Sequence, residues 1–189
     1  MARVKYLDQS DLAPEDQELL ARSANFFRAF VHSPEAYRSF GQLGGWIRNT
    51  STLDSRLREM AILQVGYLAR SAYEWSHHVK IGQEFGVAKA DIQAIATESE
   101  GGESDLAPLD RTVLRAAREI TEDLRVSDET FAALTQALSN EHLVDLILTI
   151  SYYNSVVRFL ASFDIDVEPS YQPYLDEFPL PPWQRTEGI

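Results

Sequence analysis

Apolar residues recur along almost the whole chain at spacings of three and four positions, and no long alternation of apolar and polar residues interrupts them. This period is that of an amphipathic α-helix. The pattern therefore predicts an all-α protein built as a multi-helix bundle. We expect helices over residues 14–31, 34–45, 57–69, 73–85, 89–98, 107–125, 128–138 and 141–163.

Two of these helices, 57–69 and 141–163, are apolar around most of their circumference. A helix without a polar face has to be buried on all sides. We expect the first to be the core helix and the second to be buried against other parts of the protein. The segment SEGGESD, residues 99–105, contains two glycines among acidic and serine residues and predicts an exposed loop inside the same domain.

The end of the chain, residues 167–189, contains five of the eight prolines and predicts an extended segment. A chain of 189 residues is long enough to bury one sizeable core. We therefore expect a single helical domain over residues 1–189 that ends in an extended, proline-rich tail.

The charge balance narrows the range of partners. Asp and Glu number 29 against 17 Lys and Arg, which gives a net charge of −12 without a basic cluster. Nucleic acid is not an expected partner. The chain has no cysteine, which removes disulfides, thiolate metal sites and thiol redox chemistry. The first residues lack the apolar core of a signal peptide, and no run of about 18 apolar residues follows. We expect a cytoplasmic protein without membrane contact.

The stretch SAYEWSHHVKIG, residues 71–82, contains the main candidate chemistry. On a helix, Ser71, Glu74 and His78 share one face, while His77 lies about 100° around the axis. A carboxylate beside an imidazole can fix the ring's tautomer and raise its basicity, as a general base requires. The same residues would also fit a solvated helix face or a histidine satisfied in the core.

Glu59 adds to this candidate site. It lies in LREMAILQVGYL among mostly apolar neighbours, and a buried carboxylate needs a partner. We expect it to meet the face of Glu74 and His78, and the distance along the chain fits two helices that cross at a wide angle.

The segment RLREMAILQVGYLARSAYEWSHHVKIGQEFGV resembles the core of the carboxymuconolactone decarboxylase family, which includes the alkylhydroperoxidase D proteins. The segment SYYNSVVRFLASFDIDVEP resembles the carboxy-terminal helix of its decarboxylase-like members. The resemblance implies an all-helical fold and a homo-oligomer, either a trimer or a hexamer.

The peroxidase branch of that family uses a glutamate with a Cys-x-x-Cys-x-x-x-His element. The resemblance places Glu59 at the glutamate, Ser71 and Glu74 at the two cysteines, and His78 at the histidine. A hydroxyl and a carboxylate cannot exchange a disulfide, so the thiol peroxidase cycle cannot run on this chain.

The decarboxylase branch needs neither thiol nor cofactor, and its reaction removes carbon dioxide from an unsaturated lactone acid. The resemblance implies a small, anionic substrate and a proton-transfer pair of Glu74 and His78, with Glu59 as the residue that orients them or as a second acid. The candidate substrate-binding residues are Ser71, His77, Arg58, Tyr153 and Arg158, and Arg56 and Lys80 are further cations near the motif.

Two alternatives from other classes stay open. One is a redox-dead family member in which the core serves binding or assembly. The other is a mononuclear metal site formed by His77, His78 and one carboxylate, although adjacent residues of a helix point about 100° apart and rarely chelate one ion. We expect a site without a bound metal ion.

The expected homo-oligomer also has support from the pattern of apolar residues. The helix 141–163 has more apolar surface than one packed face would use, and Phe178, Leu180 and Trp183 in the tail need a surface to dock on. We expect subunits to bury this helix and the tail, with Arg158 or Tyr153 contributed across a subunit boundary.

Overall fold

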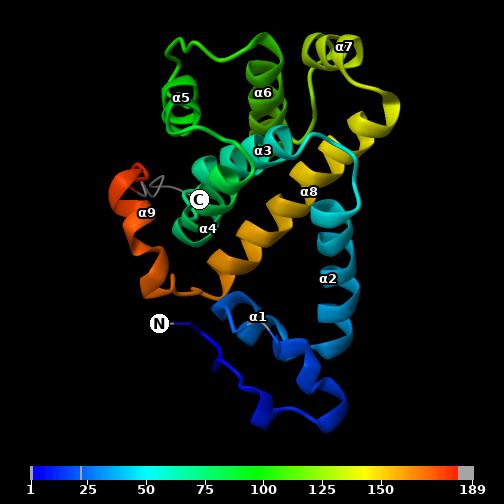
Figure 1. Cartoon of the computed structure of the whole chain (residues 1–189), viewed down its shortest axis with the longest axis vertical. Helices are drawn as coiled ribbons and strands as arrows, with labels where there is room; N and C mark the ends of the chain where they lie inside the picture. Colours follow the sequence, from blue (N-terminus) through cyan, green and yellow to red (C-terminus); the bar gives the residue numbers. More distant parts are fainter. Residues whose placement is uncertain (1, 22, 183–189) are drawn as a thin grey trace.

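The structure is a computed structural model that describes residues 2–21 and 23–182, and over these residues it contains helices and no strand (Figure 1). The all-α prediction is confirmed. In chain order the 3₁₀-helices and α-helices are η1 (Gln9–Asp11), η2 (Pro14–Ala21), α1 (Asn25–Phe30), α2 (Pro34–Asn49), α3 (Ser55–Leu68), α4 (Ala72–Glu84), α5 (Lys89–Ser99), α6 (Pro108–Asp123), α7 (Asp128–Ala137), α8 (Asn140–Ser162), η3 (Pro169–Tyr171) and α9 (Gln172–Glu177).

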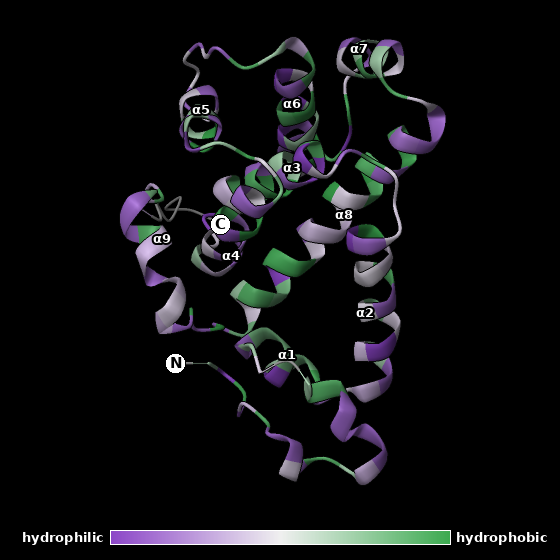
Figure 2. Ribbon diagram, viewed as in Figure 1, coloured by the Kyte–Doolittle hydropathy of each residue, from purple (hydrophilic) through white to green (hydrophobic). Residues whose placement is uncertain are grey.

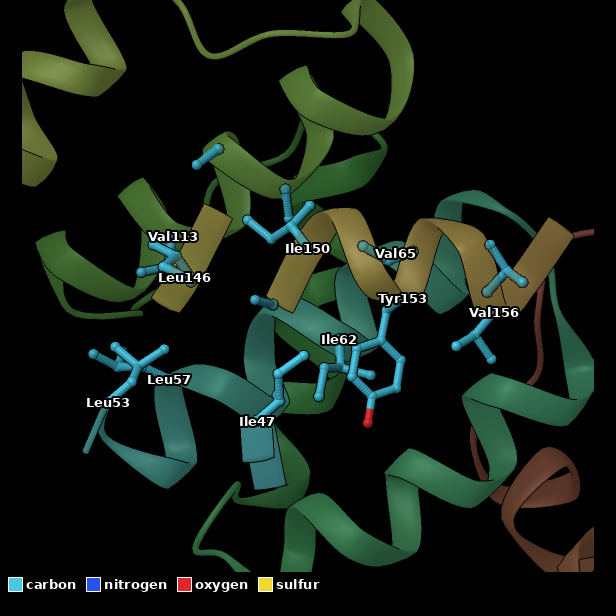
Figure 3. Packing of buried hydrophobic residues seen from close by; sticks show 14 of the residues in the cluster. Ile47, Leu53, Leu57, Ile62, Val65, Val113, Leu146, Ile150, Tyr153 and Val156 are labelled. Atoms are coloured by element: carbon cyan, nitrogen blue, oxygen red, sulfur yellow. The ribbon is translucent and has the colours of Figure 1, made fainter. Parts of the chain in front are cut away.

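The centre of the fold is α3, as its lack of a polar face predicts. It packs against α4, α5, α6 and α8, and every residue from Leu57 to Tyr67 is buried. Figure 3 shows apolar side chains of this core, among them Ile62 of α3 with Ile150 and Tyr153 of α8. Each large aliphatic side chain buried in this way contributes about 1.5–3 kcal/mol of transfer free energy.

The long helix α8 is apolar along most of its length (Figure 2). By length and composition alone it could cross a membrane, but more than half of that stretch is buried inside this fold. It occupies the place of a core helix against α3 and α6.

Two helix starts differ from the predicted ones for identifiable reasons. Residues 14–31 do not form one helix, because η2 ends at Ala21 and residues 23–24 are not helical. A new helix begins at Asn25, whose backbone N–H donates to Glu168 at 2.6 Å. The helix predicted over residues 57–69 begins earlier, at Ser55, and its cap is Asp54, which accepts from the Leu57 N–H at 2.9 Å.

The predicted end of the second helix at Gly44 and Gly45 is also wrong, because α2 continues to Asn49. Gly44 is inside the helix where Tyr152 of α8 packs against it, and a Cβ at Gly44 would lie 2.9 Å from Tyr152 Cζ and closer still to its hydroxyl oxygen. The Tyr152 hydroxyl donates to the Phe40 carbonyl at 3.1 Å. This glycine permits a close helix contact and does not end the helix.

We expect Gly44→Ala to lower the free energy of unfolding by about 1–2 kcal/mol, because overpacking against Tyr152 outweighs the gain in helix propensity. Gly45→Ala is the matched control, since a Cβ there has no neighbour within 4 Å. It should raise the free energy of unfolding by about 0.5–1 kcal/mol. Urea unfolding of both variants measures the difference, and an equal effect of the two substitutions would contradict this role of Gly44.

The tail after α8 is not wholly extended, which corrects the prediction for residues 167–189. Residues Gln172–Glu177 form α9, and Pro173 lies in its first turn, where a missing N–H costs nothing. The helix packs on α4, and Trp75 Nε1 donates to the Phe178 carbonyl at 2.7 Å. Phe178 is therefore buried within its own chain, while Trp183 lies outside the described residues.

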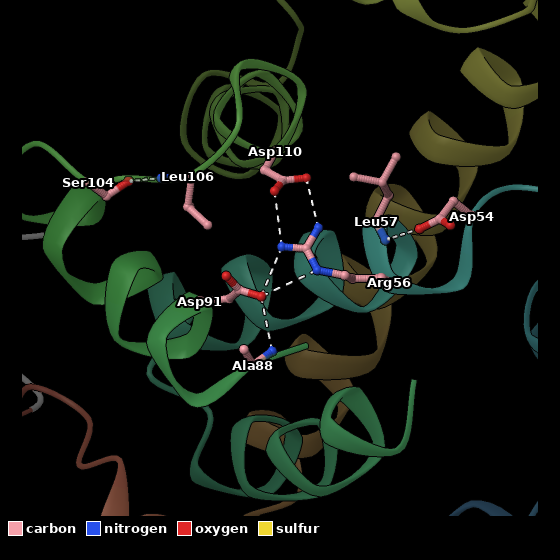
Figure 4. A network of polar contacts seen from close by, with 8 residues as sticks. All are labelled: Asp54, Arg56, Leu57, Ala88, Asp91, Ser104, Leu106 and Asp110. Atoms are coloured by element: carbon pink, nitrogen blue, oxygen red, sulfur yellow. Dashed lines mark hydrogen bonds and ion pairs between the residues drawn. The ribbon is translucent and has the colours of Figure 1, made fainter. Parts of the chain in front are cut away.

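A separate ionic contact joins α3 to the two following helices. The guanidinium of Arg56 donates to Asp91 of α5 at 2.9 Å and to both oxygens of Asp110 of α6 at 2.9 and 3.0 Å (Figure 4). Bidentate pairs of this kind fix orientation as well as distance. Arg56 therefore has a structural role in this fold.

Candidate functional site

A cavity of about 630 Å³ lies between α2, α4, α8 and the segment that precedes α2. This volume falls in the usual range for small-molecule sites. Glu74 and His78 of α4 line it, together with Tyr152 and Tyr153 of α8 and Arg48 of α2.

The local sequence explains why α4 presents these groups. Arg70 adopts φ +49° at the turn after α3, and Ser71 then caps α4 by accepting from the Glu74 N–H at 3.4 Å. Gly66 allows α3 to approach α4 closely, since a Cβ there would lie 3.3 Å from the Trp75 backbone nitrogen. The close approach brings a side chain of α3 within reach of α4.

The imidazole of His78 joins the two helices by binding a carboxylate at each ring nitrogen. Its Nδ1 lies 2.6 Å from Glu59 Oε2, and its Nε2 lies 3.0 Å from Glu74 Oε1. Glu59 is fully buried, and Glu74 and His78 are 4% and 5% exposed. The structure thus brings together the three residues predicted to form the catalytic group, and their catalytic role stays a prediction.

The protonation states follow from this geometry. Burial favours the neutral form of His78, but the charges and hydrogen bonds of Glu59 and Glu74 outweigh it and raise the pKa of His78 to about 9. Burial also favours neutral Glu59, but His78 and Arg58 hold the pKa of that carboxyl below its usual value. His78 is therefore an imidazolium at neutral pH that hydrogen-bonds Glu59 through Nδ1 and forms an ion pair with Glu74 through Nε2, whereas the general base predicted from the sequence would need a neutral ring.

Arg58 completes the charge balance of this group. It is 1% exposed and donates through Nε and Nη2 to Glu59 Oε1 at 3.2 Å. Two cations, Arg58 and His78, thus face two carboxylates, Glu59 and Glu74. A cluster with no net charge avoids the large cost of burying an unpaired ion.

Tyr153 contributes a neutral hydroxyl beside the imidazolium. Its ring meets that of His78 edge to face, with centroids 5.0 Å apart. Burial, followed by the charges of Glu74 and Glu59, raises the pKa of Tyr153 well above its usual value. The hydroxyl therefore stays protonated and can act as a hydrogen-bond donor in the cavity.

His77 occupies a different place from His78. Its ring is stacked between Tyr73 and Tyr171, with centroids 4.1 and 3.6 Å away, and its Nε2 lies 3.1 Å from Glu168. These contacts attach the segment after α8 to α4. His77 also lines the cavity, next to Tyr73.

Three residues predicted to bind substrate do not line the cavity. Ser71 is the cap of α4, Arg58 is committed to Glu59, and the exposed Arg158 donates to the Asn154 carbonyl at 2.8 Å. The other two cations near the motif are also occupied, Arg56 by Asp91 and Asp110 and Lys80 by the face of Tyr171 at 5.7 Å. Their predicted contact with substrate is not supported by these positions.

Two arginines of α2, Arg38 and Arg48, do line the cavity, and sequence reasoning missed both. Arg48 lies in the last turn of α2, and the sequence predicted that this helix would end before it. The available signal was an arginine directly after the apolar pair Trp46 and Ile47, which suggests continuation of the helical stripe.

The metal alternative finds no support in the geometry. Within residues 2–21 and 23–182, no three His, Asp or Glu side chains are grouped so that they could hold a metal ion. His77 and His78 are turned to different partners, Glu168 and the pair of Glu59 and Glu74.

The fold is all-helical and of the alkylhydroperoxidase D-like type. A family model described as the carboxymuconolactone decarboxylase family matches residues 34–119, a segment that includes Glu59, Glu74 and His78. Residues 34–119 are thus similar to this family, as the resemblance predicted.

Solved structures show the same fold at low sequence identity. A peroxidase-related protein from Ralstonia eutropha JMP134, described as an alkylhydroperoxidase AhpD core, is 16% identical with a TM-score of 0.78 over 92% of this chain and 95% of its own. The debrominase Bmp8, as a variant in complex with 2,3,4-tribromopyrrole, is 20% identical with a TM-score of 0.77 over 94% of this chain and 100% of its own. A peroxidase-related protein from Silicibacter sp. TM1040 is 16% identical with a TM-score of 0.71 over 90% of this chain and 97% of its own. The comparison with curated proteins finds no match.

Proposed function

We propose that the protein is a cofactor-independent lyase or isomerase that uses Glu74 and His78 to transfer protons on a small, anionic organic acid or lactone. The observation that carries this proposal is the buried His78 imidazolium, held between Glu59 and Glu74 beside a cavity large enough for such a molecule. Titratable groups whose environments are perturbed in this way are typical of sites of chemistry.

The positions suggest a role for each group. Glu59 does not line the cavity and holds the inner nitrogen of His78, so it is a positioning residue. Glu74 and His78 both line the cavity, and Glu74 Oε1 lies 3.0 Å from His78 Nε2. When this pair delivers a proton to the substrate, the cluster loses one positive charge. A proton from solvent restores that charge after the product leaves.

For a decarboxylation the bonds balance without any further reactant. The bond between the substrate carbon and its carboxylate breaks, carbon dioxide leaves, and the electron pair stays on the carbon skeleton as a dienolate. The neutral Tyr153 hydroxyl can donate a hydrogen bond to the enolate oxygen, and the Glu74–His78 pair supplies the proton that the carbon then takes. An isomerisation needs the same pair to remove and return one proton.

The test is carbon dioxide release and ultraviolet absorbance change with carboxymuconolactone and related unsaturated lactone acids. We expect turnover by the wild type and a loss of at least about 100-fold in kcat for Glu74→Gln, which keeps the side chain's size but removes its charge. Glu84→Gln, on the exposed end of the same helix, is the control and should keep full activity. Equal kcat for Glu74→Gln and the wild type would overturn the assignment of Glu74, and no turnover of any such acid would overturn the proposed reaction.

A binding role without chemistry is the second candidate, favoured by the aromatic side chains around the cavity. It predicts that the wild type binds ring-shaped acids but converts none of them. Calorimetry and the turnover assay on the same samples separate the two candidates.

We also propose that the chain forms a homo-oligomer, a trimer or a hexamer, as the family resemblance implies. Leu124 is 90% exposed at the end of α6 and Val144 is 64% exposed on α8, and apolar side chains left in this way are often covered by a neighbouring subunit. The tail packs on its own chain through Phe178, so this proposal rests on Leu124 and Val144 and not on the tail. Light scattering at micromolar concentration tests the assembly, and a monomer there would contradict it.

A further inference from the structure

The cavity beside Glu74 has a wall of aromatic rings. Helices α1, α2 and α8 contribute Phe26, Phe27, Tyr37, Tyr152 and Tyr153. The rings are held by one another, as the edge-to-face contact of Phe27 with Tyr37 at 5.8 Å shows. Such a wall gives dispersion and stacking contacts to a flat ring and offers little to a short flexible acid.

Phe26 and Phe27 lie before residue 34, where the match to the family model begins. They belong to α1, which is held in place by the segment after α8 and by α4: the Asn25 N–H donates to Glu168, and the Phe26 N–H donates to the Tyr73 hydroxyl at 3.2 Å. This part of the wall is therefore a built feature of this chain's fold.

Two arginines line the cavity, but only one of them has its charge uncommitted. Arg38 is paired with Asp16 and with Glu35. The guanidinium of Arg48 is on a half-buried residue, and it forms no hydrogen bond or ion pair with any residue that the structure describes. Its positive charge reaches Tyr152 and Tyr153 and lowers the pKa of both hydroxyls against the effect of burial.

We propose that Arg48 binds the carboxylate of a small, ring-containing acid whose ring packs against the aromatic wall and whose reacting end faces Glu74. A guanidinium matches a carboxylate with two parallel N–H donors, and the contact is stronger where the surroundings exclude water. The Glu74 carboxylate also lines the cavity, and the positive charge of His78 is committed to Glu59 and Glu74, so the retained anionic group of the acid is oriented toward Arg48.

This inference rests on the proposed function only in stating which end of the acid reacts. The contact between Arg48 and the carboxylate is a binding contact, and binding can be measured without turnover. The two can therefore fail separately. The probes are benzoate, its neutral isostere benzamide, and acetate, which has the charge without the ring.

Isothermal titration calorimetry of the wild type should give binding of benzoate about 10- to 100-fold tighter than of benzamide or acetate. Arg48→Met should lower the benzoate affinity by the same factor and leave benzamide unchanged. Arg48→Lys should retain part of the preference for benzoate, because it keeps the charge without the bidentate geometry. Arg158→Met, which removes an exposed arginine of α8 that does not line the cavity, should behave as the wild type.

Equal affinity for benzoate and benzamide in the wild type would overturn the proposal, as would unchanged benzoate affinity in Arg48→Met. A thermal melt of each variant shows whether it is folded. If Arg48→Met does not fold, Arg48→Lys is the deciding variant: a weaker preference for benzoate over benzamide than in the wild type supports the proposal, and an unchanged preference contradicts it. Glu74→Gln should bind benzoate at least as tightly as the wild type. Turnover of a lactone acid without benzoate binding would reject Arg48 alone, whereas benzoate binding without turnover of any acid would reject the proposed reaction alone.

Discussion

Replacing Glu59 with alanine is expected to lower the free energy of unfolding by about 3–5 kcal/mol, the typical cost of removing one partner from a buried ionic group. Glu59 is fully buried and binds two cations, with Arg58 at 3.2 Å and His78 at 2.6 Å. Its removal leaves the 1% exposed Arg58 without its carboxylate and His78 with Glu74 alone.

Urea denaturation at pH 7 measures this effect, and the matched control is a surface ion pair. Glu129 lies 3.1 Å from Arg115 with its side chain 85% exposed, so Glu129→Ala should change the free energy of unfolding by about 0–1 kcal/mol. If Glu59→Ala costs no more than Glu129→Ala, the group does not have the buried ionic character that we assign to it.

The sequence predicted the central part of the fold because the density and spacing of apolar residues dominate there. Helix α3 lacks a polar face and α8 is mostly apolar, and Gly86, at φ +88°, follows the end of α4 as a residue suited to the left-handed conformation that ends helices. Tertiary contacts decided the places where prediction failed. Gly44 and Gly45 were predicted to end a helix, but the side chain that packs against Gly44 is that of Tyr152, more than a hundred residues away in the sequence. No local pattern contains that information.

In the candidate site, too, the features set by local sequence were predicted and those set by tertiary contacts were not. The stripe of Glu74 and His78 follows from helix geometry, and the apolar surroundings of Glu59 indicated a buried carboxylate in need of a partner. The protonation of His78 could not be predicted, because it depends on both carboxylates lying within 3.0 Å of one ring. Arg48 could not be placed either, since its approach to the cavity depends on the length of α2 and its packing against α8.

The protein's stability should fall as the pH is raised from about 6.5 to about 9, because His78 is charged in the folded state. Its pKa is about 9 in the folded protein and 6.5 in an unfolded chain. A raised folded pKa contributes stability that is fully present below pH 6.5 and is lost as the pH rises through 9. At 1.36 kcal/mol per pH unit, the difference corresponds to about 3 kcal/mol.

The lowered pKa of Glu59 acts in the opposite direction at acid pH, where its contribution is lost as the pH falls through its folded value. The alkaline window therefore isolates His78. Free energies of unfolding from urea titrations at pH 6.5, 7.5, 8.5 and 9.5 should decline in the wild type and in His32→Gln, which removes an exposed histidine. They should be nearly constant in His78→Gln, because glutamine has no proton to lose in this range. A parallel decline in all three proteins would mean that the loss comes from other groups and that His78 is not held as an imidazolium between Glu59 and Glu74.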